Sequence, residues 1–277
     1  MNKKQIKLKF YYTQNKKSQE QLYIIDNKAK KVIFSQTFEI GDIIISIINN
    51  YNTIIHILNT YIKKVEKSDS LSMDETFLYM EELKKKLNAK KLNIVSELLD
   101  VEFYKISKRT EETIQYDILS NPQYSKFQGN CIVNHYIRKK GFRNDSLINF
   151  LTVFTRLLTR MKEYTEVVFD LSDSKNDVNI STELPKVSIE YDKKAKIQSY
   201  IYNIDNIKDL FLAVIYDLRL SNKFILKCAY CGNLFIPKTN KKEQRYCYSI
   251  DEYGQFTCRN KGRKRMYYYH MKEKNNN

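Results

Sequence analysis

The sequence predicts an α+β fold, mainly α, in which a helical body follows an N-terminal β-hairpin region and a small cysteine-rich module ends the chain. Alternating side chains near the N-terminus indicate strands, and apolar residues three and four apart from Asp42 to about Tyr164 indicate helices. Four of the five cysteines lie between residues 228 and 258. The 277 residues suit one or two domains, and 42% hydrophobic residues exclude a generally disordered chain.

Residues 5–38 are predicted to form strands. Polar and apolar side chains alternate from Lys7 to Tyr11, and two apolar runs, 22–25 and 32–34, flank the polar turn 26–30. This pattern is typical of a β-hairpin. No glycine-rich phosphate loop occurs in this region, so it offers no nucleotide site of that kind.

The pattern from Asp42 onward predicts a body of several helices. Ser72 with Glu75 forms a capping box that opens a second helix. Further helices are predicted over residues 92–106, 111–119 and 145–164. The first helix is expected to be one long element, because a single apolar face runs through Ile44, Ile47, Ile48, Tyr51, Ile55, Leu58, Ile62 and Val65.

The polar stretch 171–185 reads as a linker or long loop, which divides the chain into residues 1–185 and 186–277. After the linker, alternation from Val187 to Tyr191 predicts a strand with residues 197–204 as its partner. Asp205 is expected to cap an amphipathic helix that leads into the cysteine-rich module.

The cysteines predict a metal site. Cys228 and Cys231 are separated by two residues and followed by Gly232, which permits the tight knuckle that presents two sulfurs to one Zn²⁺. Cys247 and Cys258 complete a tetrahedral set and define a zinc ribbon over residues 228–258. His270 is the competing fourth ligand and is disfavoured, because it lies beyond a run of helical character.

Four soft ligands without an open position indicate a closed, structural zinc rather than one that activates water. The zinc deaminase pattern of His-x-Glu with Pro-Cys-x-x-Cys is absent, since Lys227 precedes Cys228. No catalytic constellation is recognisable, so we do not expect an enzyme. An enzyme acting on nucleic acid would need an active site in the helical body.

Three weaker candidates lie in that body. His56 lies one position from the apolar face of the first helix, where a structural role is the simpler interpretation. Cys131 and His135 are four residues apart and would share one face of a helix, but two ligands do not make a metal site. The basic run 138–143 reads first as a solvated loop.

The formal net charge of +16 favours a nucleic-acid partner only in part. Abundant Lys, Asn, Ile and Tyr are typical of an AT-rich genome, so arginine is the more informative cation. Four of the ten arginines lie in the last 33 residues, and from Ser221 onward 13 Lys and Arg face four Asp and Glu. A zinc tetrathiolate would lower the resulting +9 to about +7. The end of the chain therefore carries an electrostatic footprint suited to phosphates.

The module resembles the CGNR-type zinc finger of bacterial transcription regulators. The resemblance rests on Cys-x-x-Cys-Gly-x-x-Phe-x-Pro from Cys228 to Pro237, on the Arg-Tyr-Cys step 245–247, and on Thr257-Cys258 before a basic helix. The name-giving Cys-Gly-Asn-Arg is Cys-Arg-Asn-Lys at 258–261 here, and the loop before it looks longer. The resemblance covers about a quarter of the chain, and it implies DNA binding behind an N-terminal domain of another role.

The sequence therefore predicts a cytoplasmic zinc-ribbon protein without a membrane segment that binds nucleic acid, DNA rather than RNA, as a regulator. Asn260 is the predicted contact to a base edge, and Tyr267 to Tyr269 are stacking groups or core. The alternative is a component of a mobile element or defence system that binds a protein through its helical body, with the ribbon purely structural. The expected nucleic-acid contacts are Arg245, Arg259, Asn260, Lys261, Arg263, Lys264 and Arg265.

Overall fold

The computed structural model describes residues 4–12, 19–26, 31–68, 71, 73–103, 144–171, 185–193, 197–238, 243–250 and 254–275. Its strands are β1 (Lys4–Tyr12), β2 (Gln19–Asp26), β3 (Lys31–Glu39), β4 (Val187–Asp192), β5 (Ile197–Ile204), β6 (Leu226–Lys227) and β7 (Leu234–Phe235). Its helices are α1 (Asp42–Asn49), α2 (Tyr51–Glu66), α3 (Met73–Ala89), α6 (Asn144–Val168), α7 (Ile207–Leu220) and α8 (Thr257–Asn275), and residues 93–103 are also helical. The predicted α+β class, mainly α, is confirmed.

Five strands form one antiparallel sheet in the order β3-β2-β1-β5-β4. The predicted hairpin is present as β2 and β3, and β4 pairs with β5 as expected. β1 joins these two pairs, because Leu8 lies opposite Leu22 on one side and Tyr202 on the other. Strands from both sides of residue 185 therefore share one sheet, and the division into two domains there stays a prediction.

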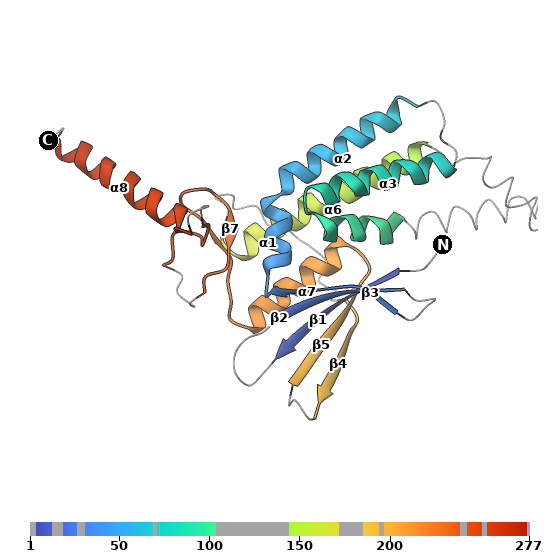
Figure 1. Cartoon of the computed structure of the whole chain (residues 1–277), viewed down its shortest axis with the longest axis horizontal. Coiled ribbons are helices and arrows are strands. Elements are labelled where there is room, and N and C mark those ends of the chain that lie inside the picture. Colours follow the sequence, from blue (N-terminus) through green and yellow to red (C-terminus); the bar gives the residue numbers. More distant parts are fainter. Residues whose placement is uncertain are drawn as a thin grey trace, which may run out of the picture.

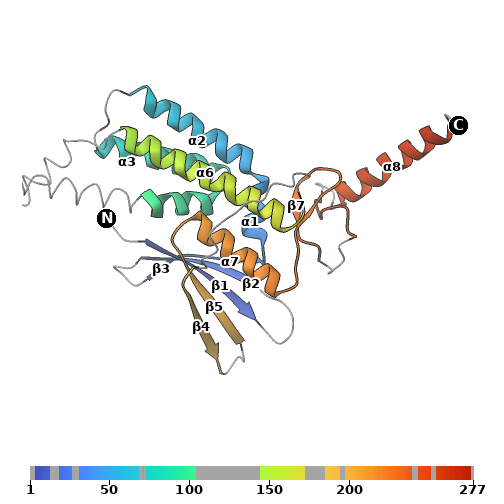
Figure 2. The same ribbon diagram turned by 180° about the vertical axis from the view of Figure 1, so that it is seen from behind.

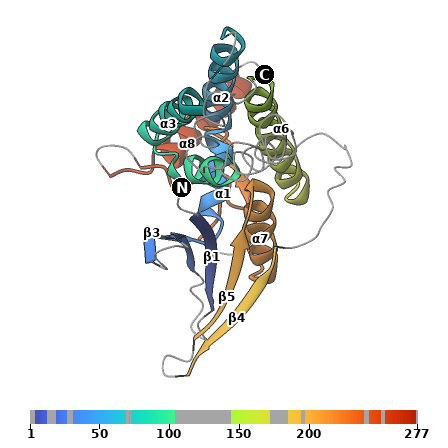
Figure 3. The ribbon, with the colours of Figure 1, turned by 90° about the vertical axis from the view of Figure 1, so that its right-hand side faces the viewer.

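One face of the sheet belongs to the core. Ile6, Leu8 and Phe10 of β1 are at most 1% exposed, as the alternation of the strand requires. α7 packs on β5 and runs along this side of the sheet (Figure 3). Its N-terminus is capped by Asn206, one residue after the predicted Asp205, because the Asn206 side chain accepts a hydrogen bond from Asp209 N–H at 2.9 Å.

The helices α2, α3 and α6 form a layer beyond α1 and α7, on the side away from the sheet (Figures 1 and 2). α2 contacts both α3 and α6, and α6 contacts α7. The ring of Phe103 lies between those of Phe77 and Phe150, with centroids 5.6 and 5.9 Å apart, so aromatic packing joins three helical segments.

The prediction of a single long first helix is wrong, because the helix is divided at Asn50 into α1 and α2. The Asn50 side chain donates to the carbonyl of Ser46 at 2.8 Å, a local contact that competes with helix continuation. The predicted helix 92–106 is helical over 93–103, and the predicted helix 145–164 corresponds to α6. The predicted helix 111–119 lies outside the described residues.

Candidate metal centre and the surface beside it

The first two cysteines lie in a tight turn between β6 and β7. The strands pair antiparallel, with Leu226 opposite Phe235. Cys228 N–H donates to Asn233 O at 2.9 Å, and Gly232 N–H donates to Cys228 O at 2.9 Å. Gly232 has φ +76°, a left-handed conformation that glycine adopts without steric cost. The predicted order of a strand, a tight turn with two cysteines and a returning strand is confirmed.

Two backbone contacts bring the other cysteines to this turn. Ala229 N–H donates to Arg245 O at 2.8 Å and so fixes the segment that carries the third cysteine. Ile250 and Phe256 form an antiparallel bridge that closes the loop between the third and fourth cysteines. Cys258 then lies in the first turn of α8 and is 4% exposed. The loop returns the chain as the sequence requires.

The four sulfurs converge. The Sγ atoms of Cys228, Cys231, Cys247 and Cys258 all lie within 4.8 Å of one another, and none forms a disulfide. Cys231 Sγ and Cys247 Sγ are 3.7 Å apart. A tetrahedron of thiolates with metal–sulfur bonds near 2.3 Å has edges of about 3.8 Å. The four cysteines could therefore hold one metal ion.

Backbone amides favour the thiolate form at the centre of this cluster. Burial raises the pKa of Cys228, but N–H groups of Cys231, Cys247 and Tyr230 point at its sulfur and lower the pKa to about 7. The Cys247 N–H lies 3.4 Å from that sulfur. Burial and the neighbouring thiols raise the pKa of Cys247. Four thiols packed this closely cannot all ionise without a cation between them.

Residue 270 lies far from this cluster along the axis of α8. Residue 270 lies within α8, twelve positions after Cys258. At 1.5 Å of rise per residue the two positions are about 18 Å apart along the helix axis. Cys258 is therefore the fourth sulfur of the group, and His270 does not compete for its place.

The cysteine-rich module is docked on the helical body by α1. The side chain of Asn49 donates from Nδ2 to Leu234 O at 3.0 Å and accepts at Oδ1 from Leu234 N–H at 2.8 Å. Leu234 is 6% exposed and belongs to the main hydrophobic core. A Cβ on Gly41 would lie 2.3 Å from Cδ1 of Ile236, so the backbone at the start of α1 touches the end of the knuckle. The module and the body thus share one packed boundary.

α8 projects away from the rest of the chain (Figure 1). Cys258 and Gly262 are its buried positions among the described side chains. All predicted nucleic-acid contacts are exposed: Arg245, Arg259, Asn260, Lys261, Arg263, Lys264 and Arg265. Tyr267, Tyr268 and Tyr269 are 53–70% exposed, so they are not core residues.

The structure gathers three of these arginines at one cavity of about 530 Å³. Arg245 comes from the segment before the third cysteine, and Arg259 and Arg263 come from successive turns of α8. The rest of the wall is Glu243, Gln244, Tyr246, Cys247, Tyr248 and Phe256. The other four predicted contact residues lie outside this lining.

Two tyrosines of this wall are held in place. The ring of Tyr246 packs so closely on α8 that a Cβ at Gly262 would lie 2.1 Å from its Cε1 atom. Tyr248 donates from its hydroxyl to Gln244 Oε1 at 2.7 Å and accepts from Lys238 N–H at 2.7 Å. The sequence reasoning missed these residues. The one signal was a glycine inside a helical run, which often marks a close approach.

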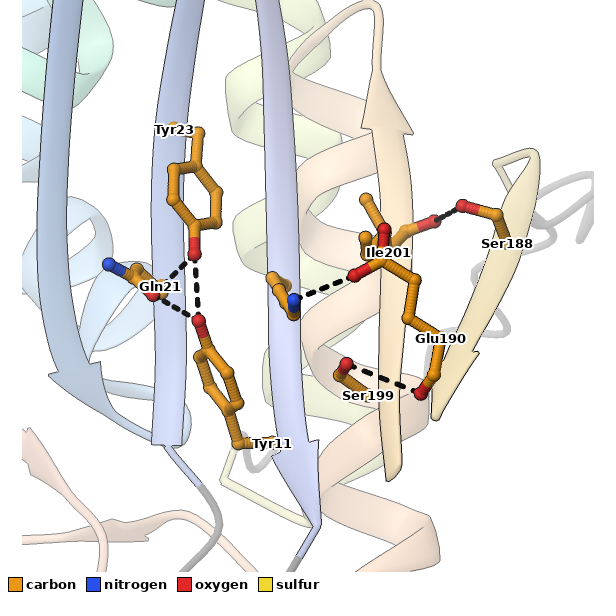
Figure 4. Close-up of polar contacts among 8 residues, drawn as sticks. Tyr11, Gln21, Tyr23, Ser188, Glu190, Ser199 and Ile201 are labelled. Carbon is orange, nitrogen blue, oxygen red and sulfur yellow. Dashed lines mark hydrogen bonds and ion pairs between the residues drawn. The ribbon is translucent and has the colours of Figure 1, made fainter. Parts of the chain in front are cut away.

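A second group of polar side chains lies on the sheet face opposite the core. Tyr11 and Tyr23 share a hydroxyl contact of 2.7 Å, and both donate to Gln21, as Figure 4 shows. Lys9 forms an ion pair of 2.8 Å with Glu190. Burial, followed by the contact with Tyr11, raises the pKa of Tyr23, so this phenol stays protonated at neutral pH. These contacts join β1, β2 and β4.

Three carboxyl groups form a third group, where the chain enters α1 and leaves α7: Glu20 and Asp217 are buried, and Asp42 lies at the surface beside them. Glu20 accepts a hydrogen bond from Gly41 N–H, and neither oxygen of the buried Asp217 meets a donor in the described part of the chain. Burial raises the pKa of Asp217 to about 7 and that of Asp42 to about 6, and it raises the pKa of Glu20 well above its usual value. The charge of Lys223 partly opposes all three shifts.

The single residues of the helical body gain little support. His56 lines a hollow on α2 with polar neighbours that include Asn52 and Lys63, and the described residues of that lining include no Cys, Asp, Glu or second His. The pair Cys131 and His135 and the basic run 138–143 lie outside the described residues.

None of the helices within the described ranges combines the length and the apolar character that crossing a bilayer requires. No protein-family model matches the chain, and neither a search of curated proteins nor a search of solved structures found a match. The cysteine cluster is compatible with a C-terminal zinc ribbon, but the resemblance to the CGNR-type finger has no further support from these comparisons.

Proposed function

We propose that the four cysteines bind one zinc ion whose role is structural. Closed sets of four thiolates are typical of structural zinc, whereas catalytic zinc keeps a position for water. The convergence of the sulfurs and the amides aimed at Cys228 support this assignment. Metal analysis of the purified chain should give one zinc per molecule, and Cys228→Ser with Cys258→Ser should abolish it. A chain that purifies without metal and refuses added zinc would contradict the proposal.

We further propose that the zinc-bound module and α8 bind nucleic acid. The observation that supports this proposal is the set of exposed cations on α8. This helix stands clear of the body (Figure 2). Lys261, Lys264 and Arg265 are exposed, and none of them forms an ion pair with an acid in the described ranges. Phosphate backbones neutralise such cations and release counterions, which supplies most of the affinity of such interfaces.

The shape of α8 favours DNA over RNA. Its 19 residues span about 28 Å, and beyond Gly262 its described side chains are exposed all round. An α-helix of this kind fits the major groove of B-form DNA, about 12 Å wide, whereas the major groove of A-form RNA is deep and narrow. Asn260 is exposed on the first turns and is the side chain suited to pair with an adenine edge.

The experiment is a binding titration with matched duplexes of DNA and RNA at several salt concentrations. Lys261→Ala, Lys264→Ala and Arg265→Ala together should weaken binding to DNA and flatten the dependence of log K on log salt by about 0.9 for each phosphate that the variant no longer neutralises. A matched variant removes three exposed lysines of the body, Lys85→Ala, Lys86→Ala and Lys90→Ala, and should bind as the parent does. An equal decrease of affinity in both variants would show that net charge alone, not α8, drives binding.

A protein partner remains the second candidate, and a different observation favours it. The second half of α8 exposes Met266, Tyr267, Tyr268 and Met271, each at least 43% accessible. Exposed aromatic and methionine side chains are enriched at protein interfaces. This candidate takes precedence if the zinc-loaded chain binds neither duplex at low salt while replacement of Tyr267 and Tyr268 by serine changes its assembly with a protein.

A further inference from the structure

We propose that the cavity beside the metal centre binds one phosphorylated nucleotide, with arginines on the phosphate and an aromatic ring on the base. The inference deepens the proposed nucleic-acid function and rests on it, because it names the unit that enters the cavity lined by Arg245, Arg259 and Arg263. The shared chemistry is a nucleoside phosphate, supplied by an unpaired or terminal nucleotide of a strand or by a free nucleotide.

Three guanidinium groups supply the charge. Arg259 and Arg263 are four residues apart on α8 and so lie on one face of the helix, while Arg245 faces them from the segment held by Ala229. Among the residues of the lining that the structure describes, Glu243 is the only acid, so this part of the wall carries an excess of positive charge. One guanidinium group can donate two parallel hydrogen bonds to two oxygens of a phosphate. The cavity should therefore bind a phosphate group more tightly than a monatomic anion such as chloride.

An aromatic ring supplies the surface for a base. Phe256 lines the cavity and is 44% exposed, although large apolar rings are usually covered. Its backbone is fixed by the bridge to Ile250, so the ring is presented from a closed loop. Bases stack on such rings with little regard to sequence, because every base has a π face.

The cavity is formed before a ligand arrives. Its volume of about 530 Å³ lies within the range usual for small-molecule sites. The ring of Tyr246 packs on Gly262, and the hydroxyl of Tyr248 makes two hydrogen bonds, one to Gln244 and one from Lys238 N–H. Cys247 belongs both to this wall and to the cysteine cluster. A rigid wall loses little conformational freedom when it binds, which favours affinity.

The position of the cavity relates it to α8. Lys261 and Lys264 lie outside the lining on the same helix as Arg259 and Arg263. If the unpaired or terminal nucleotide of a strand entered the cavity, the next phosphates of that strand would therefore lie near Lys261 and Lys264. The two sets of cations can be changed separately, which lets the experiment separate this inference from the proposed function.

The test is calorimetric titration of the intact, zinc-loaded chain with deoxyadenosine 5′-monophosphate, inorganic phosphate and deoxyadenosine. The nucleotide should bind at least tenfold tighter than either part. Phe256→Ala should weaken nucleotide binding about tenfold or more while leaving phosphate binding within about twofold. Arg259→Ala with Arg263→Ala should weaken both ligands. The body variant with Lys85, Lys86 and Lys90 replaced should match the parent.

A second arm compares a short DNA strand with and without a 5′-phosphate. Tighter binding of the phosphorylated strand supports the inference and identifies a strand end as the source, and nucleotide binding without that preference supports a free or internal nucleotide. Absence of saturable nucleotide binding, or equal binding by Phe256→Ala, overturns the inference. The proposed function fails separately, through unchanged duplex binding when Lys261, Lys264 and Arg265 are replaced.

Discussion

The ring of Tyr246 occupies the space that a side chain at Gly262 would fill, since a Cβ there would lie 2.1 Å from Cε1 of the ring. A glycine inside a helix costs about 1 kcal/mol relative to alanine, and here it permits the ring to lie directly on α8. The same ring is part of the wall of the nucleotide cavity. Packing of the module and shape of the cavity therefore depend on one contact.

Gly262→Ala should destabilise the module despite the gain in helix propensity. Overpacking of a well-filled contact costs about 1–3 kcal/mol, which outweighs the roughly 1 kcal/mol gained. Thermal unfolding followed by circular dichroism measures the decrease in stability. Tyr246→Ala in the same chain removes the clashing ring, so the glycine change should cost less there. Additive effects in this double-mutant cycle would show that the two residues do not share a contact.

Asn49→Ala should loosen the module from the body. It removes both hydrogen bonds to Leu234 and leaves the backbone groups of a buried residue without partners, which costs about 1–3 kcal/mol. Amide hydrogen exchange of Leu234 should become faster. Asn59→Ala, at an exposed position of α2, is the control and should leave this exchange rate unchanged. Unaltered exchange in Asn49→Ala would contradict the docking role.

Removal of the proposed zinc ion should disorder the module while sparing the sheet. The core of the module contains three buried residues, Cys228, Phe235 and Cys258, which is too small to hold a fold without a further constraint. A chelator or Cys258→Ser should therefore reduce the helical signal by the share of α8 and abolish nucleotide binding. Added zinc should restore the chelated protein and not the variant. An unchanged spectrum of the metal-free chain would refute a structural role.

The convergence of the four cysteines was predictable because cysteine spacing is local chemistry. Two cysteines separated by two residues and followed by glycine specify a knuckle, and the turn at Gly232 follows from it. The strands were predictable for a similar reason, since alternation from Lys7 to Tyr11 reports one buried face. The helix break at Asn50 was not, because the apolar stripe continues through it and a side-chain contact decides the outcome.

Contacts between distant segments had no sequence signal. Nothing in the residues around Asn49 or Leu234 indicates that the side-chain amide of Asn49 forms hydrogen bonds with the backbone of Leu234, 185 residues away. The pairing of β1 with β5 was hidden in the same way, because pairing of strands far apart in sequence leaves no local mark. The basic run of α8 was visible, but its convergence with Arg245 required the fold of the loop between them.

Stability of the body should fall as pH rises through neutrality. Burial raises the folded-state pKa of Asp217 from 3.8 to about 7, so between these values the folded protein holds a proton that the unfolded chain releases. The stabilising contribution of this proton is complete below the unfolded pKa and is lost as pH rises through the folded pKa. The pKa values of Asp42 and Glu20 are raised as well, so all three groups act in the same direction.

Asp217→Asn replaces one of these three carboxyl groups with a neutral side chain of the same shape. Urea unfolding at about pH 5 and about pH 8 should show the parent losing stability between the two, and the variant losing less by about 3 kcal/mol. Glu81→Gln, on the exposed face of α3, should follow the parent. Equal losses of stability in the variant and the parent would contradict this prediction. They would show that the buried carboxyl of Asp217 is ionised in the folded protein, with its negative charge stabilised by the positive charge of Lys223.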